Sequence, residues 1–235
     1  RIASLLDLSG GLDALGKPMQ DTMTFAVEEI NAAGGLLGKQ IELVTYDTQS
    51  DMRLYPQYAQ QAVMKDKVAA AFGGITSASR EVMRPVFRRL NTLYFYNTQY
   101  EGGVCDRNIF CTGITPAQKQ SKHVPYAMNK WGKKIYTLAA DYNYGQITAD
   151  WTRKYCMDNG GQIVGQDFFP LDVTNFGSTI QKIQEAKPDF IYTVLVGGAH
   201  QSFYRQWAAA GMNTRIPLAS TTMTIGGEQK FLAPE

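Results

Sequence analysis

Three hydroxyl residues follow a pair of glycines at residues 73–79, which read GGITSAS. Glycines allow a sharp turn, and the start of a helix offers N–H groups and a positive dipole end to the carboxylate or carbonyl oxygen of a small ligand. The alternative is an ordinary helix N-cap, but one cap explains only one of three hydroxyls. We therefore take Thr76, Ser77 and Ser79 as candidate ligand-binding residues.

Two aromatic turns carry further polar groups. Residues 94–101 (YFYNTQYE) offer aromatic walls with a hydroxyl and an amide, and residues 141–145 (DYNYG) offer two phenols that could close over a ligand. Core packing is the alternative for the aromatic residues, and we prefer it for Phe95. The remaining candidate ligand-binding residues come from these turns and from the ends of two later strands: Tyr96, Thr98, Gln99, Tyr142, Tyr144, Gly197 and Thr221.

Catalytic motifs are missing from the sequence. Residues 9–14 (SGGLDA) do not match the G-x-G-x-x-G of dinucleotide-binding proteins, and no P-loop, G-x-S-x-G or H-x-x-x-H motif occurs. His123 and His200 fall in predicted helices, where we expect surface positions. We expect no enzyme, catalytic residue, metal or cofactor, although a cysteine nucleophile that meets a histidine only in space stays an alternative.

Three cysteines leave the redox chemistry open. Cys105 and Cys111 bracket a short loop and form no C-x-x-C motif with each other or with Cys156. A small disulfide loop is one interpretation, in an oxidising compartment. A free buried thiol at Cys111 is the other.

Composition excludes several classes of protein. The chain has 235 residues, of which 44% are hydrophobic, 11% aromatic and 19% charged. The aromatic content and low net charge argue against disorder. With 23 basic and 21 acidic side chains, the net positive charge is too small to attract a nucleic acid. Apolar stretches such as residues 68–72 are far shorter than the roughly 20 residues of a membrane span. No leader peptide is visible, so we expect an export signal to be removed or absent.

Strand and helix patterns alternate along the whole chain, which predicts an α/β fold of two Rossmann-like lobes with parallel sheets. We expect a first lobe at residues 1–115 and a second at 116–235, with the boundary near residues 113–118. A helix opening at Pro18 carries an apolar stripe and ends at Gly34. The predicted strands are residues 2–8, 41–46, 68–72, 93–96, a crossing strand at 108–112, then 135–140, 162–168, 190–196 and 216–220.

A known family shares several of these motifs. Residues 34–43 (GGLLGKQIEL), after Glu29-Ile30-Asn31, resemble the type I periplasmic substrate-binding proteins of the branched-chain amino acid transporter class. The resemblance implies a periplasmic, monomeric protein whose two lobes close over a small ligand and deliver it to an ABC transporter permease in the membrane. The family normally continues for roughly 100 further residues. We therefore expect the chain to be truncated and the first sheet to be incomplete.

A narrower resemblance rests on residues 96–102 (YNTQYEG), 108–113 (NIFCTG), 141–144 and 217–222 (PLASTT). Together they look like the urea and short-chain amide binders, a branch that includes a cytoplasmic amide sensor. That likeness implies a pocket lined by Ser77, Tyr96, Thr98, Tyr142 and Tyr144. Ile75 departs from the pattern, because the amide sensor has an aromatic residue there.

The acidic residues available at the site predict whether the ligand carries a positive charge. A buried ammonium needs an acidic partner, and the branched-chain amino acid branch has a glutamate after the last strand of its second lobe. Here residues 219–223 read ASTTM. We therefore expect urea or a short amide, with its oxygen held by Ser77 and Thr98. The alternatives are a branched-chain or other small amino acid bound through Asp141 or Glu101, and an amide sensor in the cytoplasm.

Overall fold

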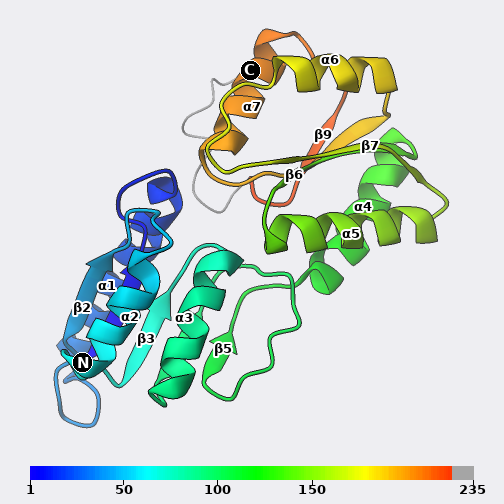
Figure 1. Ribbon diagram of the computed structural model, residues 1–235. Helices are drawn as coiled ribbons and strands as arrows, with labels where there is room; N and C mark the ends of the chain where they lie inside the picture. The colour runs from blue at the N-terminus through cyan, green and yellow to red at the C-terminus, as the bar shows by residue number, and fades with distance from the viewer. Residues whose placement is uncertain (224–235) are drawn as a thin grey trace. The chain divides into compact units, whose positions relative to one another are not determined.

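The computed structural model describes residues 1–223, and the chain divides into two compact units, Arg1–Gly113 and Ile114–Glu235. We call them the N-terminal and C-terminal units (Figure 1). Each unit contains a parallel sheet of its own. The α/β class with two parallel sheets, expected from the alternation of strand and helix patterns, is confirmed.

The N-terminal sheet has the strand order β2-β1-β3-β4-β5, and every neighbouring pair is parallel. Its strands are β1 (Ile2–Leu6), β2 (Leu43–Asp47), β3 (Ala70–Gly73), β4 (Leu93–Tyr96) and β5 (Ile109–Cys111). The short β5 was expected to cross between the lobes. It instead pairs with β4 as an edge strand, with Tyr96 opposite Cys111. The prediction was wrong because a strand's partner does not follow from its own residues.

Alternation along β1 places helices on both faces of this sheet. Ala3 and Leu5 pack into the core beneath α2 (Leu54–Met64) and α3 (Ser77–Arg89). Ser4 points the other way, and its hydroxyl donates to Gln20 of α1 (Asp13–Ala32) at 2.5 Å. Successive side chains of a strand face opposite sides. The polar contact at Ser4 therefore places α1 opposite α2 and α3.

Helix α1 begins before Pro18, five residues earlier than expected. Proline favours the first turn but is tolerated further in at the loss of one backbone hydrogen bond. The added turn packs tightly on the sheet, because a Cβ on Gly16 would lie 1.9 Å from the carbonyl oxygen of Asp7 at the end of β1. The predicted apolar stripe is not a buried face: Leu15 and Gly16 are the residues of α1 that are buried.

The C-terminal unit is a three-layer sandwich. Its sheet has the order β7-β6-β8-β9, all parallel. In Figure 1, α4 and α5 lie on one face of this sheet and α6 and α7 on the other. The elements are α4 (Pro116–Trp131), β6 (Lys134–Ala140), α5 (Asn143–Asp158), β7 (Gln162–Phe169), α6 (Gly177–Ala186), β8 (Phe190–Val194), α7 (Gly198–Ala209) and β9 (Leu218–Ser220).

One glycine in each unit brings a helix against the carboxyl end of a strand. Gly145 of α5 has the same role in the C-terminal unit as Gly16 of α1 has in the N-terminal unit. A Cβ on Gly145 would lie 1.9 Å from the carbonyl oxygen of Ala140. In open α/β sheets, ligands bind beyond the carboxyl ends of strands. These glycines therefore bring a helix close to the sheet edge where the candidate residues lie.

Candidate ligand-binding site

Two of the three hydroxyls after the glycine pair form the hydrogen bonds that cap the N-terminus of α3. Thr76 is the N-cap, and its side-chain oxygen accepts from the backbone N–H of Ser79 at 3.0 Å. The Ser79 hydroxyl donates to the carbonyl oxygen of Thr76 at 2.7 Å. Both residues are buried. Gly73 and Gly74 precede this cap at φ of 132° and 73°, a region that favours glycine.

Ser77 belongs to a buried ionic network. Its hydroxyl donates to the carboxylate of Glu101, whose other oxygen accepts from the guanidinium of Arg80. Arg80 is only 1% exposed, and its guanidinium carbon lies 4.9 Å from the ring centre of Tyr96 and 5.5 Å from that of Tyr100. Burial alone would lower the pKa of Arg80, but the hydrogen bond and charge of Glu101 outweigh it and the pKa is raised. The guanidinium therefore stays charged inside the fold.

Tyr96 and Thr98 converge on one carbonyl group. The phenol of Tyr96 donates to the carbonyl oxygen of Ile75 at 2.8 Å, and the Thr98 hydroxyl donates to the same oxygen at 3.0 Å. Burial raises the pKa of Tyr96, and hydrogen bonds with Thr98 and Ser77 oppose the rise. The three hydroxyls therefore form one cluster. Tyr96 is buried, whereas Thr98 and the next residue, Gln99, are half-buried.

The paired tyrosines of the C-terminal unit stand at the start of α5, just after β6. Their ring centres lie 6.0 Å apart, with Tyr144 buried and Tyr142 half-buried. Tyr144 also lies near Tyr192 of β8, whose pKa is raised by burial and then by Tyr144. The phenol of Tyr192 is 3.0 Å from Nδ1 of His123 on α4.

Gly197 and Thr221 follow the next two strands of the same sheet. Gly197 precedes α7 at a φ of 65°, which favours glycine. Thr221 binds back to β8, because its N–H and its hydroxyl both donate to the carbonyl oxygen of Thr193, at 3.1 and 3.4 Å. Lys119 of α4 donates to the Thr221 carbonyl oxygen at 3.0 Å, and burial lowers the pKa of Lys119 to about 8.

His200 is fully buried, so the expectation of a surface position was wrong. Its ring contacts that of Tyr204 edge-on, with centres 4.3 Å apart. Its two nitrogens lie 3.5 Å from the hydroxyls of Ser220 and Thr222. Burial lowers the pKa of His200 to about 4, so the ring is neutral at pH 7. A helical histidine two residues after a Gly-Gly pair at a strand end is a signal that sequence reasoning overlooked.

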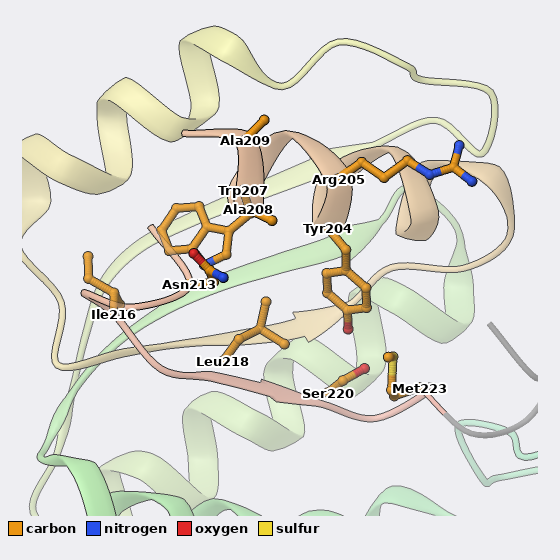
Figure 2. Close-up of a pocket in the computed structure, with 10 residues that line it drawn as sticks. All are labelled: Tyr204, Arg205, Trp207, Ala208, Ala209, Asn213, Ile216, Leu218, Ser220 and Met223. Atoms are coloured by element: carbon orange, nitrogen blue, oxygen red, sulfur yellow. The ribbon is translucent and has the colours of Figure 1, made fainter. Parts of the chain in front are cut away.

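A cavity of about 750 Å³ lies between α7 and β9, and no sequence pattern pointed to it. Figure 2 shows side chains of α7 on one side and residues 216–223 on the other. Its volume is within the usual range for small-molecule sites. The Trp207 indole nitrogen is buried without a hydrogen-bond partner among the residues described. The lining residues are Tyr204, Arg205, Trp207, Ala208, Ala209, Asn213, Ile216, Leu218, Ser220 and Met223.

Other chemistry is limited within residues 1–223. No group of three His, Cys, Asp or Glu side chains there has a metal-binding arrangement. Cys105, Cys111 and Cys156 are free thiols, so the disulfide interpretation does not describe this structure. Burial raises the pKa of the half-buried Cys111. No helix in this part of the chain is long and apolar enough to cross a membrane.

Polar side chains lie at the carboxyl edges of two parallel sheets, which is where open α/β sheets bind ligands. The chain belongs to the periplasmic binding protein family: the model of the "periplasmic binding protein domain" matches residues 1–229. Membership in a family of binding proteins confirms that the chain is not an enzyme.

Particular relatives add detail. The chain is 22% identical over 246 residues to a Leu/Ile/Val-binding protein homologue of Brucella abortus, covering 96% of this chain and 61% of that protein. It is 25% identical over 223 residues to the leucine-, isoleucine-, valine-, threonine- and alanine-binding protein of Pseudomonas aeruginosa, covering 92% of the chain and 59% of that protein. The chain thus spans about three fifths of the length of these relatives.

Solved structures share the fold. A Streptococcus pneumoniae branched-chain amino acid transporter substrate-binding protein, solved with isoleucine, gives a TM-score of 0.80 at 23% identity, covering 93% of this chain and 63% of that one. A Rhodopseudomonas palustris solute-binding protein, solved with 3,4-dihydroxybenzoic acid, gives 0.84 at 21% identity, covering 94% and 61%. At such identities, the likeness shows the fold alone.

Proposed function

We propose that this chain is the ligand-capturing part of an ABC transporter solute-binding protein that acts in the periplasm and delivers a small solute to a membrane permease. The family match over residues 1–229 carries this proposal. Polar side chains at the carboxyl edges of both sheets support it, because this is where open α/β sheets bind ligands. The ligand-binding residues we propose are those selected from the sequence, with His200 and Glu101 added.

A small amino acid is the first candidate ligand. The relative from Pseudomonas aeruginosa is a leucine-, isoleucine-, valine-, threonine- and alanine-binding protein, and the one from Streptococcus pneumoniae was solved with isoleucine. The benzoate complexes of related folds widen the range to organic acids. None of the relatives named above is described as a urea or amide binder.

A short-chain amide or urea is the second candidate, and one observation favours it. The described residues at the end of β9 and just after it, 219–223, present hydroxyls and no carboxylate, and two of them lie beside the neutral ring of His200. A buried ammonium without an acidic partner is costly. A neutral ligand avoids that cost.

A thermal-shift screen tests the proposal and separates the candidates. The purified protein is heated with leucine, valine, alanine, benzoate, urea, acetamide and propionamide, each over a concentration series. A ligand that binds only the folded state raises the melting temperature by mass action. A shift with the amino acids alone supports the first candidate, and a shift with the amides or urea alone supports the second. No shift with any compound contradicts the proposed function.

A further inference from the structure

The cavity between α7 and β9 lies where small side chains end the helix beside the last strand of the sheet. Leu218 and Ser220 are alternate residues of β9, so both face the same side of the sheet and both line the cavity. Helix α7 ends in Ala208 and Ala209, whose methyl groups fill little of the space in front of them. The resulting volume of about 750 Å³ has room for a molecule of one or two rings.

Two aromatic side chains form much of the cavity wall. Figure 2 shows the ring of Tyr204 directed from α7 toward Ser220 of β9. Trp207 lines the same space and is only 2% exposed. Aromatic rings gain energy beyond area burial when another ring stacks on them or meets them edge-on. The wall therefore favours an aromatic occupant over a saturated one.

The cavity offers hydrogen-bonding groups but little charge. No acidic side chain is among the described residues that line it, so a cation would be buried without a partner. Figure 2 shows the Arg205 side chain extending away from Leu218 and Ser220. The Ser220 hydroxyl and the Asn213 amide can each donate or accept a hydrogen bond. An uncharged molecule with a hydroxyl group matches these walls.

Two residues that line the cavity also contact His200. The ring centre of Tyr204 lies 4.3 Å from that of His200, and the Ser220 hydroxyl lies 3.5 Å from its Nε2 atom. The Tyr204 hydroxyl also lies 3.1 Å from the hydroxyl of Thr193 on β8. A molecule in the cavity that contacts Tyr204 or Ser220 therefore acts on the surroundings of His200.

We propose that this cavity is a second binding site, for an uncharged aromatic molecule of one or two rings that carries a hydroxyl group, and that its occupancy alters the surroundings of His200. The site lies between a helix and the sheet face that the helix covers, not among the polar residues beyond the strand ends. It therefore goes beyond the proposed function and does not depend on which solute the protein captures.

The indole N–H signals in the nuclear magnetic resonance spectrum of the purified protein test the site. The chain has three tryptophans, and Trp131 and Trp151 belong to α4 and α5, on the other face of the sheet (Figure 1). Trp207→Phe identifies the Trp207 signal. Phenol and 2-naphthol, each titrated to saturation, should shift that signal and leave the other two in place.

Two results of this titration would overturn the inference and leave the proposed function standing. One is no shift of the Trp207 signal, or an equal shift of all three tryptophan signals. The other is a Trp207 signal that moves with protein concentration before any phenol is added, because a second copy of the chain would then cover the cavity.

Matched compounds test the chemical class of the occupant. Cyclohexanol keeps the hydroxyl of phenol without the aromatic ring, and 2-naphthoate keeps the rings of 2-naphthol but carries a charge. We expect each to bind at least about tenfold more weakly than its matched phenol or naphthol, measured by the Trp207 shift. Equal binding of cyclohexanol would contradict the aromatic preference. Equal binding of 2-naphthoate would contradict the preference for an uncharged molecule.

A variant that fills the cavity assigns the binding to it. Ala208→Phe places a ring in the space, and we expect phenol to bind about tenfold more weakly or not at all. Ala210→Phe is the control, because Ala210 is exposed just after α7 and is not among the lining residues. If Ala208→Phe does not fold, Ala209→Phe at an exposed lining position replaces it. Unaltered binding in the filled variant would place the phenol elsewhere and overturn the inference.

The two histidines of the chain measure the coupling. His123 is the control, because it belongs to α4 on the other face of the sheet. Saturating phenol should shift the ring signals of His200 and leave those of His123 unchanged. A His200 signal that stays in place while the Trp207 signal shifts fully would show that occupancy of the cavity does not reach His200, and that part of the proposal would be wrong.

Discussion

The carboxyl edge of each sheet is stabilised within its own unit, and the two edges use different interactions. In the N-terminal unit the central element is a buried ion pair, Arg80 with Glu101, to which Ser77 is attached. In the C-terminal unit it is a neutral ring, His200, between the hydroxyls of Ser220 and Thr222. Charge fixes the direction of hydrogen bonds because a carboxylate can only accept. Neutral imidazole and hydroxyl groups can exchange the roles of hydrogen-bond donor and acceptor. The edge of the C-terminal sheet can therefore donate a hydrogen bond to a ligand or accept one from it.

Breaking the buried ion pair should have the largest effect. Arg80→Met leaves Glu101 charged and buried, and we expect the N-terminal unit to lose about 3–5 kcal/mol of unfolding free energy. The exposed pair of Arg53 and Asp51 is the control, because Arg53 is 89% exposed and Arg53→Met should change stability by less than about 1 kcal/mol. Urea denaturation of both variants measures the difference. Similar losses would show that burial does not distinguish the two pairs.

Acid should weaken the C-terminal unit through His200. The pKa of this ring is about 4 in the folded protein and about 6.5 in an unfolded chain. Between these values the unfolded state binds more protons. The stability contributed by the neutral ring is therefore full above pH 6.5 and is lost as the pH falls toward 4. The loss should reach about 3 kcal/mol.

Hydrogen exchange, followed separately in each unit between pH 7 and pH 4.5, measures that loss. His200→Gln cannot titrate, so its C-terminal unit should show a flatter dependence. Both histidines of the chain lie in the C-terminal unit, so the N-terminal unit serves as an internal control for histidine titration. An unchanged pH slope in His200→Gln would contradict the prediction.

Glycine substitutions should show that the two units share one packing device. Gly16→Ala and Gly145→Ala each place a Cβ 1.9 Å from a backbone oxygen, and we expect each to cost its own unit about 1–3 kcal/mol. Gly198→Ala is the control, because it also lies near the start of a helix but has no heavy atom within 4 Å. Melting curves compare the three. A stable Gly145→Ala variant would mean that α5 can move away from β6.

Thiol labelling should give the smallest and most local signal. Cys105 is exposed, Cys111 is half-buried with its pKa raised by burial, and Cys156 is buried. Because thiolates are the reactive form, a maleimide should label Cys105 first in the native protein. Mass spectrometry of timed samples identifies the site, and Cys105→Ser should remove the fast phase. Rapid labelling of Cys156 would contradict the burial described here.

Local patterns predicted the elements better than their partners. The strand at 93–96 has the expected bounds, since it depends on its own residues. The pairing of β5 with β4 was missed, as was the burial of His200, because both depend on segments distant in the sequence. The hydroxyls of Ser77, Tyr96 and Thr98 were predicted to share a pocket. Their assembly around Ile75 and Glu101 was not, since those contacts join residues 21 to 24 positions apart.

The two sheets also have a consequence for how the chain acquires its structure. Among the described residues, β1 to β5 all come from the N-terminal unit and β6 to β9 all from the C-terminal unit. Within residues 1–223, no strand pairing has to wait for a partner from the other unit, and during synthesis residues 1–113 can pair their strands before β6 has left the ribosome. Each parallel pairing still requires a long chain crossover to close first, which makes such sheets slow to form. We expect two folding phases, with the earlier one assignable to the N-terminal sheet.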